Sequence, residues 1–328
     1  MQLSRKLGLV LSLAAAMTLV LVSCRGMRPW ASEPPPAVQE QQQVPAGGPK
    51  TFAVIYPMSH PYFEWITEST EAAAKEAGVT LLVKAPDEAH LEQQIRMLEM
   101  TIKQKVDGIA IDPVDAETLT PYIDKAVEAG IPVVCFDSDA PLSKRLAFIG
   151  SDNTLAGQRM GAAIDRMLKG RGMVFVGVGM ESMLSQQQRL HGLIDYLHSH
   201  TDIQVLETRA NEGSEDLAVQ QLEEMIEAHP HFDAFIGLDS VSGPASILVW
   251  KAMGLHQTAV TFDLMPKIIE GIKNGQMSAA LSRQEHTWGR LIVTRLLQAS
   301  RGLEIPEFEE TGTLVVTPEN VKDAEGWK

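Results

Sequence analysis

From about Thr51 to Thr317, short apolar runs alternate with segments of helical periodicity, and this alternation constrains the fold more than any other feature. Most of the runs are continuously apolar and rich in Val and Ile, which indicates strands covered by helices on both faces of a sheet. The predicted strands are Phe52–Tyr56, Thr80–Lys84, Gly108–Asp112, Pro132–Asp137, Ala147–Gly150, Met173–Gly177, Gln204–Thr208, Ala234–Leu238, Ala259–Phe262, Ala279–Ser282 and Leu314–Thr317.

The helical segments between these runs have recognisable ends. Pro61 suits the first turn of a helix, and Gly78 ends the same segment. Asp115 and Asp152 are placed to cap later helices. One helix should bury Phe63, Ile66, Thr70, Ala73 and Ala77, and the next should bury Leu91, Ile95, Leu98 and Ile102.

Strands and helices in this order form two similar halves, Thr51 to about Ser151 and about Asp152 to Thr261. We therefore predict an α/β chain of two Rossmann-like, doubly wound parallel lobes. The expected hinge has three chain crossings, near Ser151–Asn153, Arg283–Glu285 and Thr311–Thr313. The expected lobes are residues 51–152 with 284–312 and residues 153–283 with 313–328, and a ligand should bind where the carboxyl ends of the strands face each other.

The first 24 residues indicate export. Arg5 and Lys6 precede an apolar run from Leu7 to Val22, which is too short and wrongly flanked for a comfortable membrane span. Residues 1–23 are therefore predicted to be a signal peptide. Leu21-Val22-Ser23-Cys24 resembles a bacterial lipobox, which would make Cys24 the lipidated first residue; an ordinary signal peptide or an uncleaved anchor is the alternative.

The segment 24–50 is rich in Pro, Gln, Ala and Gly and has no apolar periodicity, so it is predicted to be a disordered tether. Loss of Arg5 and Lys6 with the signal peptide would change the formal charge from -14 to -16. Such an acidic chain argues against a nucleic-acid partner and against electrostatic binding to anionic lipid. Attachment to the membrane should then depend on the lipid at Cys24.

Polar and aromatic side chains follow the predicted strands, where a ligand would lie. They are His60, Tyr62, Phe63, Asp112, Asp137, Ser138, Arg189, Asp239, Asp263 and Arg283. Carboxylates accept hydrogen bonds from hydroxyl groups, and Arg donates in a fixed fork. Aromatic rings cover the C–H faces of a sugar ring, so this set suits a polyol.

Four segments, taken in order, resemble the ribose-type sugar-binding proteins of ABC importers. They are Ser-His-Pro-Tyr-Phe-Glu-Trp at 59–65, Gly-Ile-Ala-Ile-Asp-Pro at 108–113, Ile-Pro-Val-Val-Cys-Phe-Asp-Ser-Asp at 131–139 and Phe-Ile-Gly-Ser-Asp-Asn-Thr-Leu-Ala-Gly at 148–157. The similarity runs from about Thr51 to about Thr317. The Asp-Ser-Asp run is especially similar to the branch that includes rhamnose-binding and autoinducer-2-binding proteins.

The resemblance implies a role for most of these residues. Tyr62 and Phe63 fall on the aromatic pair that packs against the sugar, and Asp137 falls on a carboxylate that binds its hydroxyls. Arg189 falls on the ligand-binding arginine, and Asp263 on an aspartate of the C-terminal lobe.

Asp239 occupies a place commonly held by asparagine. Three positions depart from the ribose pattern: Ser138 replaces an arginine, His60 replaces an asparagine, and Arg283 stands where glutamine is usual. These changes argue against ribose itself, and the additional Arg283 suggests a carboxylated or otherwise anionic ligand.

The expected function is capture of a monosaccharide or sugar-like ligand by a monomeric lipoprotein outside the cytoplasm, for the membrane subunits of an ABC importer. A sensor subunit for a histidine kinase or chemoreceptor is the alternative, because both functions can use the same closed form. No catalytic residue, cofactor or metal is assigned, since the cleft acids suit hydroxyl binding and the histidines lack zinc spacing. A LacI-type repressor would need an N-terminal DNA-binding segment where the export signal stands.

Overall fold

The computed structural model describes residues 49–324. The predicted signal peptide, the tether and the lipidation site Cys24 lie outside these residues, except for the last two positions of the tether. Within residues 49–324, no helix is both long enough and apolar enough to cross a membrane.

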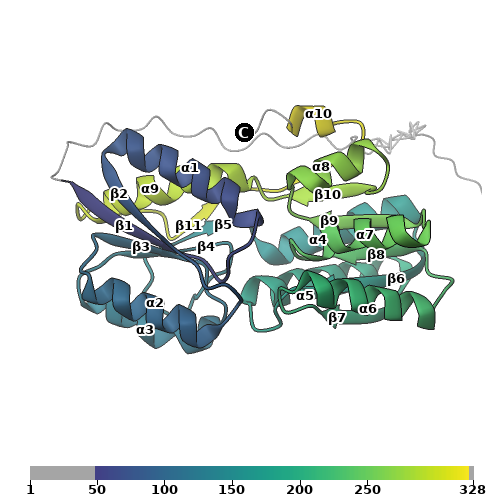
Figure 1. The fold of residues 1–328 in the computed structure, drawn as a ribbon, viewed down its shortest axis with the longest axis horizontal. Helices are drawn as coiled ribbons and strands as arrows, with labels where there is room; N and C mark the ends of the chain where they lie inside the picture. Colours follow the sequence, from purple (N-terminus) through teal and green to yellow (C-terminus); the bar gives the residue numbers. More distant parts are fainter. Residues whose placement is uncertain (1–48, 325–328) are drawn as a thin grey trace, which may run out of the picture. The chain divides into compact units, whose positions relative to one another are not determined.

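The strands form two sheets of six strands each (Figure 1). The first has the order β11-β5-β4-β3-β1-β2 and is parallel throughout. Its strands are β1 (Lys50–Ile55), β2 (Val79–Lys84), β3 (Gly108–Ile111), β4 (Val133–Phe136), β5 (Ala147–Gly150) and β11 (Phe308–Glu310).

The second sheet has the order β12-β10-β9-β8-β6-β7, and only the β10–β12 pair is antiparallel. Its strands are β6 (Arg171–Val178), β7 (Asp202–Ala210), β8 (Ala234–Gly237), β9 (Thr258–Phe262), β10 (Ala279–Ser282) and β12 (Leu314–Val316). The prediction of two doubly wound, mostly parallel α/β lobes is confirmed.

Helices cover both faces of the first sheet. Phe52 and Val54 of β1 belong to the same apolar cluster as α1 (Tyr62–Ala77) and α9 (Trp288–Ala299). The alternate residues of β1 belong to the cluster of α2 (Leu91–Lys103) and α3 (Ala116–Glu128). With both faces covered, successive residues of the central strands β1, β3 and β4 are apolar, which explains the continuous runs in the sequence. We call this sheet with its four helices the first lobe.

The second sheet is covered in the same way. One face packs against α4 (Asn153–Leu168) and α5 (Leu184–His200). The other packs against α6 (Glu215–Ala228), α7 (Ser242–Met253) and α8 (Pro266–Lys273), with the short α10 (Val321–Ala324) beside α8. We call this sheet with its helices the second lobe.

The helix ends agree with the predictions, but the buried faces agree only in part. Gly78, with φ of 66°, ends α1, and Asp115 and Asp152 cap α3 and α4 through Oδ1 at 2.9 Å. Ala77, predicted to be buried, is exposed. On α2 the buried residues are Gln94, Leu98 and Thr101. Gln94 is buried because it donates a hydrogen bond to the carbonyl of Asp112, which an apolar pattern does not reveal.

The chain passes between the two sheets three times, and the crossings are bonded to one another. Ser151 Oγ donates to the carbonyl of Gly312 at 2.6 Å, and Gln284 Nε2 donates to the carbonyl of Thr311 at 2.6 Å. Thr311 Oγ1 in turn donates to the carbonyl of Arg283 at 3.0 Å. These bonds join the three segments of the predicted hinge.

One strand was not predicted. The three residues of β11 are Phe-Glu-Glu, at the edge of the first sheet beside β5, and two of them are exposed. Such a short polar segment carries no apolar pattern from which a strand could be recognised.

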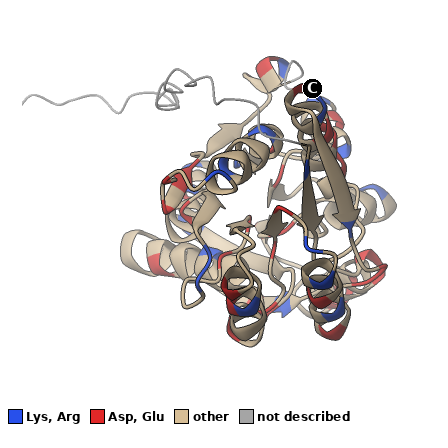
Figure 2. Cartoon of the chain, turned by 90° about the vertical axis from the view of Figure 1, so that its left-hand side faces the viewer, with Lys and Arg blue, Asp and Glu red and all other residues tan. Residues whose placement is uncertain are grey.

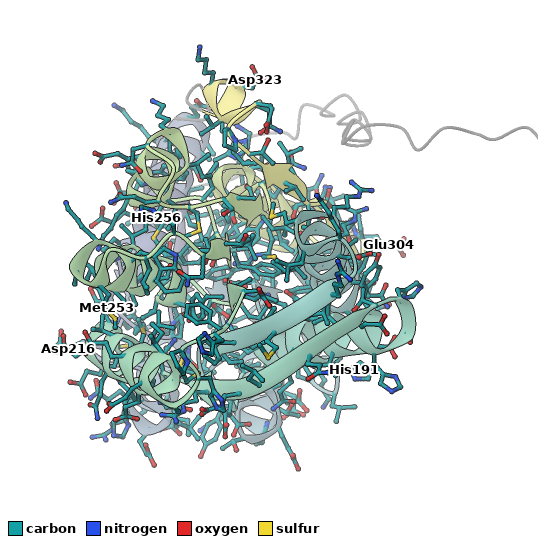
Figure 3. The ribbon with its side chains drawn as sticks, turned by 90° about the vertical axis from the view of Figure 1, so that its right-hand side faces the viewer. His191, Asp216, Met253, His256, Glu304 and Asp323 are labelled. Carbon is teal, nitrogen blue, oxygen red and sulfur yellow. The ribbon has the colours of Figure 1, made fainter. Side chains whose placement is uncertain are left out.

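Charged residues are dispersed on the outside of the fold. Figure 2 shows Lys and Arg interspersed with Asp and Glu along the helices in that view. Exposed pairs such as Lys125 with Glu99 and Lys144 with Glu128 belong to this mixture. In the second lobe, the exposed His191 and His256 lie well apart (Figure 3).

Candidate ligand-binding site

The loops after β4 and β9 begin with aspartates in the same unusual conformation. Asp137 follows β4 with φ of 58°, and Asp263 follows β9 with φ of 66°. Non-glycine residues rarely adopt this left-handed conformation, although Asp tolerates it better than most. Each lobe thus turns a carboxyl group sharply off the end of a central strand, at the edge where ligands of doubly wound sheets bind.

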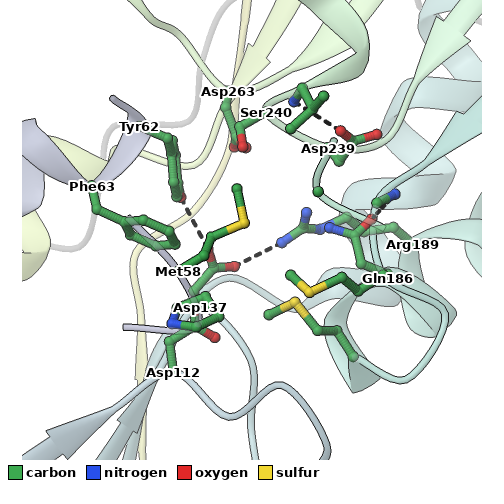
Figure 4. Close-up of a pocket in the computed structure, with 16 residues that line it drawn as sticks. Met58, Tyr62, Phe63, Asp112, Asp137, Gln186, Arg189, Asp239, Ser240 and Asp263 are labelled. Atoms are coloured by element: carbon green, nitrogen blue, oxygen red, sulfur yellow. Dashed lines mark hydrogen bonds and ion pairs between the residues drawn. The ribbon is translucent and has the colours of Figure 1, made fainter. Parts of the chain in front are cut away.

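A cavity with 410 Å³ of empty space, part of it open to solvent, lies at this edge (Figure 4). Side chains of both lobes line it. The predicted site residues that do so are Tyr62, Phe63, Asp112, Asp137, Arg189, Asp239 and Asp263. The close-up shows their side chains surrounding one space, with Tyr62 and Phe63 on the side of the first lobe.

Asp137 is the central acceptor of the site. Its Oδ1 accepts from Arg189 Nη2 at 2.8 Å and also from Arg283 Nη1. Its Oδ2 accepts from the hydroxyl of Tyr62 at 3.1 Å and from Arg283 Nη2 at 3.3 Å. Burial alone would raise the pKa of Asp137, but the charges of Arg283 and Arg189 outweigh it and hold that pKa below its ordinary value. Asp137 is therefore a carboxylate bound from both lobes.

Arg283 joins the carboxyl groups of the two lobes. Besides Asp137, it bonds Oδ1 of Asp263 through Nε at 3.0 Å and through Nη2 at 2.7 Å. Nη2 also lies 2.5 Å from the hydroxyl of Tyr62, and the guanidinium lies 4.9 Å from the ring centre of Trp288. Burial opposes its charge, but Asp137 and Asp263 raise the pKa of Arg283 far above its ordinary value.

Arg189 is held by its own lobe as well as by Asp137. Nε donates to Oδ1 of Asn153 at 2.8 Å, and Nη1 donates to the carbonyl of Leu238 at 3.1 Å. With its amide oriented to suit its neighbours, Gln186 accepts from Nη1 at 3.2 Å. Asn153 also donates to the carbonyl of Asp137 at 3.3 Å, so one side chain at the start of α4 supports both charged groups.

Asp112 lies deep in the first lobe, fully buried. Its Oδ1 accepts from the backbone N–H of Ser138 at 3.2 Å, while its Oδ2 has no hydrogen-bond partner. Burial, followed by the nearby charge of Asp137, raises the pKa of Asp112 well above its ordinary value. A buried polar atom without a partner is costly, and at a cavity wall it marks a position where a ligand can bind.

Asp239 has a structural role at the start of α7. Its Oδ1 accepts from the backbone N–H of Val241 at 2.8 Å and of Ser242 at 2.9 Å, and Oδ2 accepts from the Ser242 hydroxyl at 2.5 Å. These are the bonds of a helix cap, and the positive end of the helix dipole stabilises the carboxylate. Asp239 lines the cavity with most of its hydrogen-bonding capacity already used.

Three predicted residues do not line the cavity. Arg283 lies behind it and positions Asp137 and Asp263, as described above. Ser138 is fully buried, and its Oγ accepts from the backbone N–H of Ser185 in the second lobe at 3.2 Å. His60 precedes α1, and its Nδ1 accepts from the backbone N–H of Tyr62 at 3.2 Å; burial lowers its pKa.

The sequence interpretation missed other wall residues. Met58, Met180, Met183 and Gln186 all line the cavity. An apolar loop residue such as a methionine cannot be distinguished from a core residue by sequence pattern alone. Met58 in particular crosses to the second lobe, where its sulfur lies 2.8 Å from the position that a Cβ on Gly213 would occupy.

Gln94 was also missed, and it fixes the loops that carry the site. Its Nε2 donates to the carbonyls of Asp112 at 2.7 Å and of Tyr56 at 3.3 Å, and its Oε1 accepts from Val114 N–H at 3.0 Å. A polar residue every seven positions on an apolar helix face would have been the signal, since Gln94 and Thr101 are both buried.

Comparisons with known proteins agree with this geometry. The periplasmic binding protein domain model matches residues 52–304. The ribose import binding protein of Bacillus subtilis is 23% identical over 253 residues, which cover 75% of this chain and 81% of that protein. The D-ribose/D-allose-binding protein of Pseudomonas aeruginosa is 25% identical over 284 residues, which cover 82% of this chain and 87% of that protein.

A solved structure is similar over nearly its whole length. The solute-binding protein of an ABC transporter from Burkholderia graminis, determined in complex with D-arabinose, is 29% identical with a TM-score of 0.79. The match covers 83% of this chain and 96% of that one. These relatives are named as binding proteins, which confirms the prediction that the chain is a solute receptor and not an enzyme. The matched region spans both lobes and the loops that form the cavity, and the chain belongs to the periplasmic binding protein domain family.

Proposed function

We propose that the chain is an extracytoplasmic solute-binding lipoprotein that captures a monosaccharide or sugar-like ligand between its lobes for an ABC importer. One observation carries this proposal: carboxyl groups, a guanidinium and aromatic rings from both lobes line one cavity. Carboxylates and Arg suit ligand hydroxyls, and Tyr62 and Phe63 suit the C–H face of a sugar ring. The sugar-binding names of the relatives support the same ligand class.

The contacts between the lobes support capture by closure. Tyr62 and Asp137 belong to the first lobe, whereas Arg189 and Asp263 belong to the second. A ligand that contacts residues of both lobes binds the closed arrangement better than an open one, and this difference drives the change in shape. The closed form then docks on the membrane subunits of the importer.

A thermal-shift screen tests capture, with pentoses, deoxyhexoses, sugar acids and furanosyl signals as ligands, together with mass spectrometry of any ligand that co-purifies. For a sugar that binds, Asp137→Ala should raise Kd by at least about 30-fold, because a buried charged partner is lost. Asp139→Ala is the matched control, since Asp139 pairs with Arg145 and does not line the cavity. Equal effects of the two substitutions, or turnover of a bound sugar, would contradict the proposal.

The anchor is proposed from the sequence. Residues 1–23 are the signal peptide, Cys24 carries the lipid, and residues 24–50 tether the lobes at 51–152 with 284–312 and at 153–283 with 313–328. Replacing Cys24 with Ser should release the protein from the membrane fraction, and retention of the variant there would refute the lipobox. Co-purification with transporter subunits supports import, whereas co-purification with a kinase or chemoreceptor supports the sensor alternative.

A further inference from the structure

Asp112 differs from the other three carboxyl groups of the cavity in its partners. Asp137 and Asp263 accept hydrogen bonds from guanidinium groups, and Asp239 caps α7. Asp112 accepts a backbone N–H at Oδ1, but its Oδ2 is buried without a hydrogen-bond partner among the described residues. Because Asp112 lines the cavity, this oxygen remains for a ligand.

The loop that carries Asp112 does not depend on its carboxyl group. An Asp side chain commonly bonds the backbone N–H two residues farther along the chain, in an Asx turn. Here Pro113 has no N–H, and the N–H of Val114 donates to Oε1 of Gln94 at 3.0 Å. Gln94 also donates to the carbonyl of Asp112 at 2.7 Å. Gln94 therefore fixes this turn, and the carboxyl group of Asp112 is not needed to form it.

The donors of the two buried arginines are directed to other acceptors. Arg283 donates to two other carboxyl groups and to the hydroxyl of Tyr62. Arg189 donates to one of the same carboxyl groups, to a side-chain amide and to a backbone carbonyl. A ligand anion would have to displace one of these acceptors, so this geometry does not support the interpretation that Arg283 favours an anionic ligand. It also leaves Asp112 without a bonded cation among the described residues.

Burial without a bonded cation favours the neutral form of Asp112. An ionised carboxyl group in such a place is costly, and the group keeps its proton instead. Burial, followed by the charge of Asp137, raises the pKa of Asp112 well above its ordinary value and outweighs the charges of the two arginines. Tyr56 and Cys135, which interact electrostatically with Asp112, are neutral as well, because burial raises the pKa of both.

A neutral carboxyl group changes what this part of the wall offers to a ligand. The carboxylate of Asp137 can only accept hydrogen bonds, whereas a protonated Oδ2 donates one. Ring oxygens and hydroxyl oxygens of a sugar are acceptors for such a donor. On the basis of the sugar-binding function proposed above, we propose that Asp112 is a specificity-determining residue that binds the sugar as a neutral acid, with its Oδ2–H donated to a ligand oxygen.

Infrared difference spectroscopy measures the protonation state of Asp112 directly. At pH 8, where Asp263 with its pKa of about 7 is mostly ionised, the spectrum of the wild-type protein minus that of Asp112→Asn should contain the C=O band of a neutral carboxyl group. Asp107→Asn is the matched control and should not remove this band, because Asp107 pairs with Lys50 outside the cavity. A carboxylate band in place of the neutral one overturns the inference.

Calorimetry and the same infrared band test the contact with the ligand, with D-arabinose, D-allose, D-glucose and L-rhamnose as probes. For a probe that binds, Asp112→Leu should raise Kd at least about tenfold. Asp112→Asn should bind at least about fivefold more tightly than Asp112→Leu, since the amide accepts from the Ser138 N–H and places an N–H donor where Oδ2–H stood. In the wild-type protein, a saturating probe should shift the neutral carboxyl band.

The outcomes separate this inference from the proposed function. A sugar that binds while Asp112 is ionised overturns the inference and leaves sugar capture standing. The same holds if the sugar leaves the band unmoved, if a folded Asp112→Leu protein binds as tightly as the wild-type protein, or if Asp112→Asn binds as weakly as Asp112→Leu. If none of the four sugars binds, both proposals are overturned.

Discussion

Three aspartates of one cavity differ because their partners differ. Asp137 has two guanidinium partners and a lowered pKa, and the stabilisation it provides is present above its ordinary value of 3.8 and is lost as the pH falls below it. Burial raises the pKa of Asp112 well above its ordinary value, and it raises the pKa of Asp263 to about 7. The charges of Arg283 and Arg189 together outweigh burial at Asp137, whereas burial is the dominant effect at Asp112 and Asp263.

The raised pKa of Asp263 predicts a pH effect on stability. Between its ordinary value of 3.8 and about 7, the folded state binds a proton that the unfolded chain has released. The free energy of unfolding should therefore fall as pH rises through this range, by up to about 1.4 kcal/mol per pH unit for this group. Asp263→Asn should remove its share of the slope, measured by denaturant unfolding without ligand from pH 4 to pH 7.5. An unchanged slope in the variant would show that Asp263 is ionised throughout.

At two helix crossings the backbones approach each other without intervening side chains. A Cβ on Gly157 of α4 would overlap the carbonyl of Arg189 on α5, and a Cβ on Gly192 of α5 would overlap the carbonyl of Thr154. In the first lobe, a Cβ on Gly289 of α9 would overlap the backbone of α1 near Thr70. The backbones therefore touch at the turn from which Arg189 extends to the cavity.

Gly157→Ala should consequently affect binding as well as stability. The added methyl group must push α5 away, which should cost about 1–3 kcal/mol and move Arg189 relative to Asp137. Gly161→Ala is the matched control one turn along α4, where the new Cβ meets the side chain of Tyr196 at 2.8 Å. We expect lower melting temperatures for both variants and a weaker ligand affinity, by calorimetry, for Gly157→Ala alone. Equal affinities would show that the crossing does not position Arg189.

The elements and the site were predictable to different extents. Apolar runs and cap residues located the other strands and the helix ends, because those signals are local. The polar edge strand β11 has no such signal, and neither does the burial of Gln94, which depends on loops that come together only in the fold. Likewise, Met58, Met180 and Met183 could not be assigned to the cavity wall, since a loop methionine is recognised as ligand-facing only when the opposite lobe is in place.

At the scale of the whole molecule, protein side chains themselves hold the lobes together. Asp137 bonds Arg189 and Arg283, and Tyr62 bonds Arg283. Ser182 Oγ of the second lobe donates to the carbonyl of Val114 of the first lobe at 2.7 Å. These bonds stabilise the closed form before a ligand binds and so help to determine its population. A ligand must either replace some of them or add further bonds.

Arg283→Gln should shift this balance toward open lobes. The variant loses the charge that joins Asp137 to Asp263, and small-angle X-ray scattering without ligand should give a larger radius of gyration than for the wild-type protein. Arg290→Gln is the control, because Arg290 pairs with Glu76 at an exposed position. Equal radii for the wild-type protein and both variants would show that Arg283 does not stabilise closure.

Trp288 gives these movements an optical readout. Its indole is fully buried, donates to Thr311 Oγ1 at 3.1 Å in one hinge segment, and lies under the guanidinium of Arg283. The emission of an indole depends on nearby charge, so any change in the distance between Arg283 and this ring alters the fluorescence of the protein. Ligand capture in this chain should thus be visible in its own ultraviolet emission, without an attached dye.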